Sequence, residues 1–441
     1  MHSARLLLVT LSAAFALSFS DAPAHAEPYD ELPPWAENGD LPVPSWARSV
    51  APNRADAAIY ARPGRLDARR GSAQLGARLP LYATLRANGC QGRWLEVGPL
   101  AWICSDVADY SADDPVTPSL HAAHALPSLD ATPDDDGLPY RYYFAGPDGA
   151  SGFMNLETAL DDAPDLDLEP GFAVAIVGEQ SAHGETWGKT KKGRWIAMRE
   201  LIAARPSTFH GELLAGGALD FAWISADNAK TFAEPKPGKP TGSRARFERV
   251  TIYEKETAKS DVMLRVSEDS APAVWMRARD LSRPTISTPP VEAGGETSKE
   301  RWMDVDLTQQ TLVAYEGTTP VFATLVSTGR GPAGSDFATN VGTHRLWVKI
   351  FTTKMDNLDQ EDATHHYDLE DVPYVQFFDK AIALHGAFWH GDFGHVHSHG
   401  CVNLSPLDAR WLFAFTEPHL PLGWIAVLPT KLEPGTVIRV R

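Results

Sequence analysis

Cysteine is scarce in this chain, and so are positive charges and long apolar stretches. There are 3 cysteines in 441 residues, and 40 Lys and Arg stand against 57 Asp and Glu, a formal net charge of −17. Because a nucleic acid is bound through clustered Lys and Arg, this balance argues against nucleic acid as a partner. Beyond residue 26, no apolar run approaches the roughly 18 residues of a membrane-spanning helix. The sequence therefore predicts neither nucleic-acid binding nor a membrane anchor.

Residues 1–26 have the pattern of a secretory signal peptide. Arg5 precedes an apolar run from Leu6 to Phe19, and Ala24-His25-Ala26 is a small-x-small cleavage site. No cysteine directly follows the run, so a lipid anchor is not indicated. We expect an exported protein that works outside the cytoplasm.

The three cysteines are Cys90, Cys104 and Cys401. In an oxidising compartment two of them should pair. Cys90 and Cys104 share one Trp-rich segment, so we predict a disulfide between them, which leaves Cys401 as a free thiol. A buried, inert cysteine is the alternative for Cys401.

The length predicts two to four domains, and 43% apolar residues with 13 Trp and 18 Phe supply their cores. Breaker-rich stretches place the boundaries. We predict a signal peptide at 1–26, a flexible Pro-rich leader at 27–55, a small β module at 56–111, a linker at 112–137, second and third small β modules at 138–205 and 206–281, a linker at 282–299, and a C-terminal domain at 300–441.

A weak internal repeat favours the β modules. The octapeptide from Arg194 to Leu201 (RWIAMREL) resembles that from Val274 to Leu281 (VWMRARDL), and both follow short strand-like runs. A repeated β unit of about 60 to 80 residues predicts tandem small barrels, similar to bacterial SH3-type modules. We expect their Trp residues in the barrel cores, with glycan binding as the alternative.

Strand-like alternation dominates after residue 299, and helical periodicity begins only at Ser405. Ser405 is placed as an N-cap, Pro406 takes the first helical position, Asp408 the capping-box position, and Pro418 ends the helix. The predicted fold class is mainly β, with short helices.

The segment 381–404 (AIALHGAFWHGDFGHVHSHGCVNL) carries the chemistry. A thiol is a strong nucleophile only as the thiolate, so Cys401 needs a base within reach. A strand–loop–strand return would bring His385 opposite Cys401. Gly400 would free backbone N–H groups to face a developing oxyanion.

His385-Gly386, an intervening loop, and then Ser-His-Gly-Cys-Val-Asn resemble the signature of the L,D-transpeptidase catalytic family. The resemblance covers roughly residues 300–441 and implies a β-rich, sandwich-like domain. It implies Cys401 as nucleophile and His385 as general base, with the backbone carbonyl of Gly386 orienting the imidazole.

The resemblance also implies the surroundings of the nucleophile. His399 and Gly400, together with Cys401, would form the oxyanion hole, and Ser398 and Asn403 would line the substrate pocket. Tyr374 is the remaining candidate, either lining the cleft or lying in the core.

The implied reaction is peptidoglycan remodelling. The thiolate attacks the carbonyl that joins a diamino acid to the terminal D-alanine of a tetrapeptide stem. D-alanine is released, and the acyl group stays on the enzyme as a thioester. An amine of a second stem then gives a cross-link. Water would give a carboxypeptidase, and a protein amine an attaching enzyme. The implied partners are stem peptides and carbapenem-type inhibitors, the location is periplasmic and cell-wall associated, and no metal or organic cofactor is required.

Three other interpretations stay open. Five histidines crowd into 385–399, and His395, His397 and His399 would share a face on a strand, so a zinc site is an alternative, although we predict no metal. The acidic segment 356–371 is expected to be a solvated insertion, or a lid over the donor site. A non-catalytic wall-binding scaffold is the alternative from a different class.

Overall fold

The computed structural model describes residues 43–116, 127, 135–215, 217–258, 261–332, 334–358 and 366–441. Their regular structure is mostly strand, with two α-helices, α1 (Leu156–Leu160) and α2 (Pro406–Phe415), which confirms the mainly β fold class. The predicted signal peptide, most of the leader and much of the 112–137 linker lie outside the described residues. In the described part of the chain, no helix is long and apolar enough to cross a membrane.

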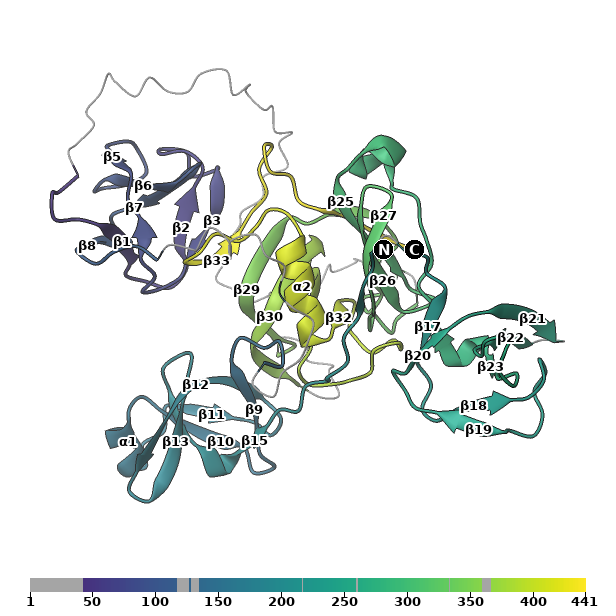
Figure 1. Cartoon of the computed structure of the whole chain (residues 1–441). Coiled ribbons are helices and arrows are strands. Elements are labelled where there is room, and N and C mark those ends of the chain that lie inside the picture. The colour runs from purple at the N-terminus through teal and green to yellow at the C-terminus, as the bar shows by residue number, and fades with distance from the viewer. Residues whose placement is uncertain are drawn as a thin grey trace, which may run out of the picture.

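The N-terminal unit contains eight short strands (Figure 1): β1 (Ser49–Pro52), β2 (Ala57–Tyr60), β3 (Arg69–Ala73), β4 (Leu79–Pro80), β5 (Ala83–Leu85), β6 (Trp94–Gly98), β7 (Ala101–Cys104) and β8 (Ala108–Ser111). Strand β1 lies within the segment predicted as leader. It pairs antiparallel with both β4 and β8, and Val50 is fully buried in the core of the unit.

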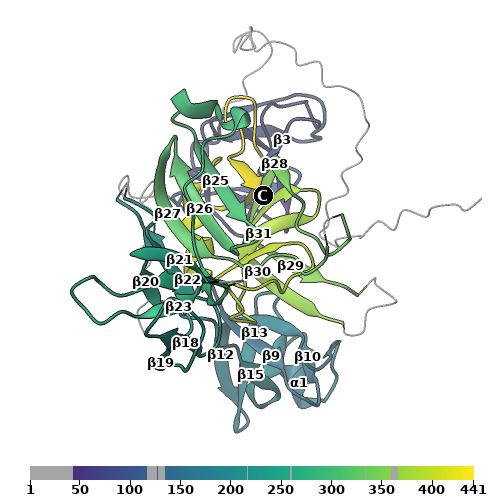
Figure 2. The same ribbon diagram turned by 90° about the vertical axis from the view of Figure 1, so that its right-hand side faces the viewer.

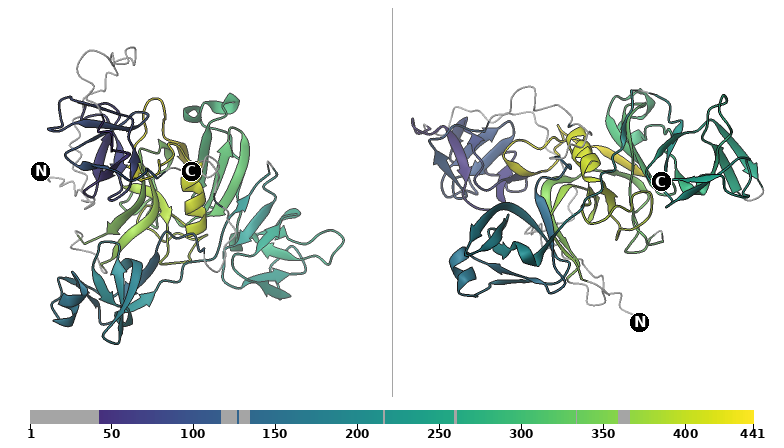
Figure 3. Two further views of the ribbon diagram at one scale, coloured as in Figure 1. Left: turned by 60° about the vertical axis from the view of Figure 1, so that its left-hand side comes forward. Right: turned by 60° about the horizontal axis from the view of Figure 1, so that its bottom comes forward.

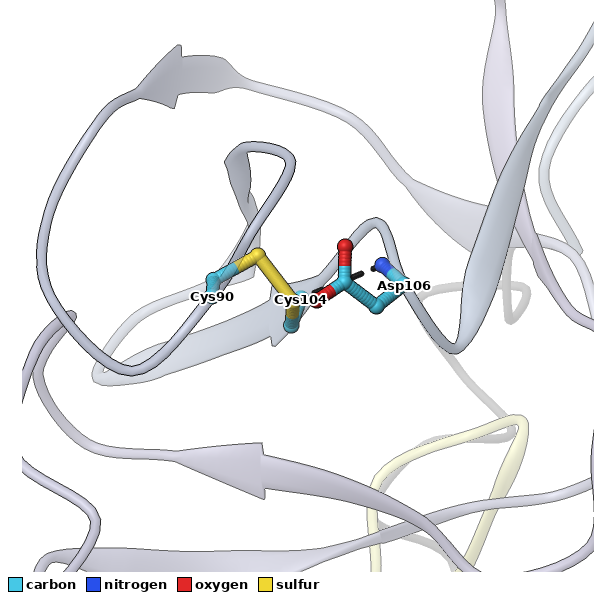
Figure 4. Close-up of side chains that lie close together, drawn as sticks. All are labelled: Cys90, Cys104 and Asp106. Atoms are coloured by element: carbon cyan, nitrogen blue, oxygen red, sulfur yellow. Dashed lines mark hydrogen bonds between the residues drawn. A yellow bond between two sulfur atoms is a disulfide. The ribbon is translucent and has the colours of Figure 1, made fainter.

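The predicted disulfide joins Cys90 to Cys104 in this unit (Figure 4). Asp106 lies beside it, and its carboxylate accepts hydrogen bonds from the backbone N–H groups of Gln91 and Gly92, both at 2.9 Å. The covalent bond and the carboxylate therefore hold the same loop against the end of β7.

The second unit contains α1 and seven strands: β9 (Arg141–Ala145), β10 (Ala150–Phe153), β11 (Leu166–Leu168), β12 (Ala173–Ala182), β13 (Glu185–Thr190), β14 (Trp195–Ala197) and β15 (Leu201–Ala203). The third unit contains eight: β17 (Phe221–Ile224), β18 (Ala229–Phe232), β19 (Gly242–Arg244), β20 (Arg249–Thr251), β21 (Glu254–Ala258), β22 (Asp261–Arg265), β23 (Trp275–Arg277) and β24 (Leu281–Ser282).

The repeated octapeptides adopt the same local structure in these two units. In each, a strand that begins at the Trp leads through one 3₁₀ turn, η1 (Met198–Glu200) or η2 (Ala278–Asp280), into a strand that begins at the Leu. The apolar residues around the turn are buried in the core of their unit. We propose that these units are the predicted modules.

The C-terminal unit contains two sheets with α2 packed between them. The first has the order β16 (Glu212–Leu213), β27 (Thr319–Leu325), β26 (Thr311–Glu316), β25 (Arg301–Asp306), β34 (Val437–Val440) and β28 (Gly342–Arg345). The second contains β29 (Val348–Asp356), β30 (Asp368–Asp379), β31 (Ile382–Gly386), β32 (Val402–Leu404) and β33 (Trp424–Val427). Both sheets and α2 contribute to one buried cluster, in which Trp411 stacks on Phe322 at 4.4 Å between ring centroids.

Helix α2 begins as predicted, but Asp408 has another role. The Oγ of Ser405 accepts a hydrogen bond from the N–H of Asp408, with Pro406 in the first turn. The Asp408 carboxylate is fully buried and accepts hydrogen bonds from the N–H of Gly211, at 2.8 Å, and the Oγ1 of Thr324, at 2.5 Å. It therefore joins α2 to β27 and to the chain just before β16.

The outer units lie on different sides of the C-terminal unit (Figures 2 and 3). The first and second units are joined to it by backbone pairing, β3 with β33 and β12 with β30, and the third unit follows directly after β16, which pairs with β27. At the first junction a Cβ on Gly71 would lie 2.3 Å from the carbonyl oxygen of Ala426, so no larger residue fits without a shift.

The predicted linker 282–299 also packs against the C-terminal unit. It forms two 3₁₀ turns, η3 (Val291–Ala293) and η4 (Gly295–Thr297). Ser287 donates to the Oδ2 of Asp304 at 2.9 Å, and its N–H donates to the Tyr315 hydroxyl at 3.0 Å. This segment is thus fastened to β25 and β26.

Replacing Cys90 and Cys104 together by Ala should lower the opening free energy of the N-terminal unit by about 3 kcal/mol, because the bond closes a short loop in the unfolded chain. Amide hydrogen exchange of β6 and β7 measures this quantity without interference from the other units. Wild-type protein reduced under native conditions is the control and should match the variant. Equal exchange in the oxidised wild type and the variant would contradict the prediction.

Candidate active site

The site is built on two neighbouring strands that run in the same direction. Strands β31 and β32 pair in parallel, with His385 opposite Asn403 and Leu384 opposite Val402. Cys401 directly precedes β32, and its Sγ lies 4.0 Å from the carbonyl oxygen of Ala381. The chain does return to a neighbouring strand, but His385 lies opposite Asn403 rather than Cys401, because the connecting segment 387–401 crosses back and makes the two strands parallel.

His385 is oriented by its own neighbour. Its side chain is 2% exposed, and its Nδ1 lies 3.2 Å from the carbonyl oxygen of Gly386. Because a carbonyl only accepts, the hydrogen sits on Nδ1 and Nε2 keeps its lone pair. Burial lowers the pKa of His385 to about 4, against a smaller opposite effect of the Gly386 hydrogen bond. The imidazole is thus neutral at pH 7 and available as a base.

Cys401 is a free, partly exposed cysteine. Burial of the sulfur raises the pKa of its thiol to about 11, with a smaller lowering by the backbone of Ala383. Among the described residues, no hydrogen bond joins its Sγ to His385. Such contacts are often long without substrate and tighten when it binds. The resting pair therefore consists of a neutral thiol and a neutral imidazole.

Ser398 closes the turn that leads into the nucleophile. Its Oγ donates to the carbonyl oxygen of Cys401 at 2.5 Å and accepts the N–H of Gly400 at 3.1 Å. Gly400 has φ +124°, which a residue with a side chain rarely adopts. The N–H expected to face an oxyanion is thus held by Ser398 in the resting structure, and an oxyanion would compete with that hydroxyl for it.

The side chain of His399 faces a group of residues that the motif does not include. Its Nε2 lies 2.7 Å from the Nη2 of Arg330, and its ring packs against Tyr367 and Phe337, with centroids at 5.9 and 5.0 Å. Burial, with the Cys401 charge adding to it, raises the pKa of Tyr367 to about 12. Arg330 and Tyr367 are therefore parts of the site that the sequence analysis missed.

Asn403 is buried and belongs to the support of the loop. Its side-chain amide lies 2.8 Å from the Nε2 of His390, and the N–H of Asp392 donates to His390 Nδ1 at 3.1 Å. Both ring nitrogens of His390 are therefore in contact with groups of this loop and of β32. Burial also lowers the pKa of His390 to about 3.

The three alternating histidines do not share a face. The Nε2 of His395 contacts the carbonyl oxygen of Ser225 at 2.8 Å, His397 contacts the Asp392 carboxylate at 3.1 Å, and His399 contacts Arg330. The expectation of a common face is wrong because this segment is a turn rather than a strand.

A different trio has metal-compatible spacing. Ligand atoms of His390, Asp392 and His397 lie within 4.8 Å of one another. Both ring nitrogens of His390 are already engaged, by Asp392 N–H and by Asn403. A metal ion could bind His390 only if one of these contacts were broken. The three side chains are therefore better suited to supporting the loop than to binding a metal.

Tyr374 lies in the core. It is 5% exposed, and its ring packs against Phe351 and Phe413 at 5.7 and 5.8 Å between centroids. Of the two possibilities for this residue, the structure favours the core.

The described ends of the acidic segment are not free in solvent. Asp356 and Asp368 flank Lys354 at 3.1 and 3.0 Å, and the segment's later acids pair with the second unit. Lys191 contacts Asp371, and Lys192 contacts Glu370, both at 2.6 Å. These acids hold the second unit against β30, while residues 359–365, at the centre of the proposed lid, lie outside the described part.

Comparison with known proteins finds a family match for the C-terminal unit. Residues 300–440 match the family model of the L,D-transpeptidase catalytic domain. None of the curated proteins matches the sequence.

Similar solved structures include three L,D-transpeptidases. That from Xylanimonas cellulosilytica is 19% identical over 35% of this chain and 63% of its own, with a TM-score of 0.23, so this chain spans less than two thirds of its length. The catalytic domain from E. faecium is 20% identical over 33% of this chain and 99% of its own, with a TM-score of 0.25. The enzyme from Mycobacterium smegmatis is 19% identical over 44% of this chain and 99% of its own, with a TM-score of 0.26.

Alkylation of Cys401 by iodoacetamide should be slow at pH 7 and should rise about tenfold per pH unit up to about pH 10, since only the thiolate reacts and burial raises the thiol pKa to about 11. Intact mass against time gives the rate. The His385→Ala variant should show the same slope, because His385 is neutral throughout this range. A plateau below pH 8 would indicate a thiolate–imidazolium pair and contradict the prediction.

Proposed function

We propose that this protein is a peptidoglycan L,D-transpeptidase that forms a thioester between Cys401 and a tetrapeptide stem. The match of residues 300–440 to the catalytic-domain family supports the class of enzyme. The observation that supports the proposal is the parallel pairing of β31 with β32, which puts the oriented His385 opposite Asn403, two residues after the free Cys401.

In the proposed first step His385 acts as the general base. Its Nε2 takes the proton of the Cys401 thiol while the sulfur attacks the carbonyl that joins the diamino acid to the terminal D-alanine. The pKa of the imidazole is about 4 and that of the thiol about 11. A standing ion pair is therefore disfavoured, and the proton moves as the carbon–sulfur bond forms. Gly386 keeps the proton on Nδ1 during this step.

The second step breaks the amide bond. The imidazolium returns its proton to the nitrogen of the leaving D-alanine, and the acyl group stays on sulfur. We propose that the N–H groups of Gly400 and Cys401 stabilise the tetrahedral oxyanion, with the Ser398 hydroxyl turning away to release the first of them.

Arg330 fits the recognition of the leaving group. Its side chain is exposed and its guanidinium is held by His399, two residues before Cys401. Because a guanidinium binds a carboxylate through two parallel hydrogen bonds, we propose that Arg330 receives the terminal carboxylate of the stem. Ser398 and Asn403 then act mainly by holding the turn and the loop.

The acceptor decides the product. An amine of a second stem gives a cross-link, water gives carboxypeptidase activity, and a protein amine gives attachment to the wall. All three reactions pass through the same acyl-enzyme, and the proposed steps use no metal or organic cofactor. We propose that the enzyme works in the periplasm, in contact with the wall.

Incubation with a disaccharide tetrapeptide, and separately with a carbapenem, should add one acyl group to the protein by intact mass. Cys401→Ala should give no adduct. His385→Gln should acylate about 10²- to 10⁴-fold more slowly, because the general base is lost. Circular dichroism of both variants controls for folding. A folded wild-type protein with a free Cys401 that gives no adduct with either reagent would overturn the proposal.

A further inference from the structure

A pocket of about 390 Å³ lies between the third unit and the C-terminal unit, separate from the residues around Cys401. Leu264 on β22 and Leu281 on β24 form part of an apolar wall. Thr308 and Gln309, in the turn between β25 and β26, add polar groups to the lining. The pocket thus offers both polar and apolar contacts to a ligand.

The acid that lines this pocket is already neutralised. Asp306 is the single acidic side chain among the lining residues, and it pairs with Arg441 at 2.9 Å. Its Oδ1 accepts the N–H groups of Thr308 and Gln309, both at 2.9 Å. Behind it, Asp304 pairs with Arg439 and Arg441. These two acids and two arginines cancel in charge.

Two lining cations remain without an acid. Among the described residues, neither Lys255 nor Arg283 has an ion-pair partner. The Oε1 of Gln309 accepts the backbone N–H of Arg283 at 3.0 Å, which fixes the point from which the Arg283 side chain reaches the pocket. In a chain of net charge −17, this concentration of unpaired positive charge indicates a site for an anion.

We propose that this pocket binds a carboxylate of a peptidoglycan stem peptide, with Arg283 and Lys255 holding the carboxylate and Leu264 and Leu281 contacting an adjacent alanine methyl group. The carboxylate chemistry follows from the pocket alone, whereas naming the stem peptide rests on the proposed function. A guanidinium beside an ammonium provides the donors that a carboxylate needs, and the apolar wall suits the small side chains next to it.

The pocket is connected to the catalytic turn through hydrogen bonds. Gln310, next to Gln309, donates from Nε2 to the Oγ1 of Thr328 at 2.6 Å and accepts the Thr328 N–H at 2.9 Å. The carbonyl oxygen of Thr328 accepts the N–H of Ser398 at 3.0 Å. A stem bound in the pocket would therefore contact a segment that is hydrogen-bonded to the turn before Cys401. Such an arrangement suits an enzyme that binds two stems of one polymer.

The test uses the full chain carrying Cys401→Ala, so that binding is measured without acylation. The probes are the free tetrapeptide stem and the same peptide with its carboxylates amidated. Amide hydrogen exchange locates the binding, and calorimetry gives Kd. The free peptide should protect residues 281–285 and 306–310, and the amidated peptide should not.

Adding either Arg283→Gln or Lys255→Gln to this chain should weaken binding at the pocket at least about tenfold, which is the usual effect of losing a charged hydrogen bond. Arg279→Gln is the matched control, because Arg279 is exposed, pairs with Asp261 at 3.8 Å and does not line the pocket. Lys255 is exposed, so its single variant should fold even where that of Arg283 does not.

Three outcomes would overturn the inference: no protection at 281–285, protection confined to 385–403, or binding that is equally strong in the Lys255 and Arg283 variants. None of these depends on whether Cys401 forms an adduct. Failure of the pocket and failure of the proposed function are therefore distinguishable.

Discussion

The two strands that hold His385 and Asn403 lie side by side and run in the same direction. A parallel pair cannot be closed by a short hairpin, so the chain must cross back before it enters the second strand. The segment that crosses back, 387–401, contains the nucleophile at its end. It has little regular structure of its own, and its geometry must come from what it contacts.

Much of that support comes from the chain that follows β27. The carbonyl oxygen of Val326 accepts the N–H of Gly394, and that of Thr328 accepts the N–H groups of His397 and Ser398. The outer units complete it. In the third unit, Ser225 contacts His395 and Arg246 donates to the carbonyl oxygen of Phe393 at 2.9 Å. In the second, the ring of Tyr142 stacks on Phe388 at 4.1 Å. These units are thus part of the site's framework, whatever else they bind.

The sequence was sufficient for the start of α2, because Ser405 and Pro406 are neighbours in the chain. It also singled out Cys401 and His385, which stand in one short motif and whose roles stay predictions. It was insufficient where the geometry depends on distant partners. Arg330 meets His399 from 69 positions away, with no local pattern around it. The expected free N–H of Gly400 is likewise occupied through the fold of the turn, which composition does not determine.

Helix α2 shows how such distant partners hold the catalytic strands. Near its first turn the buried carboxylate of Asp408 accepts the N–H of Gly211. At its last turn the buried ammonium of Lys349 donates to the carbonyl oxygens of Phe413 and Thr416, both at 2.7 Å. An acid near the N-terminus and a cation at the C-terminus both match the helix dipole.

Desolvation opposes both of these charges, raising the pKa of Asp408 to about 6 and lowering that of Lys349 to about 7. Both groups remain buried because they satisfy backbone groups that would otherwise lack partners. The helix is thereby fixed at both ends between the two sheets, and β30 and β31 pack against it. The position of the strands around the nucleophile thus depends on buried polar groups that lie outside the candidate site.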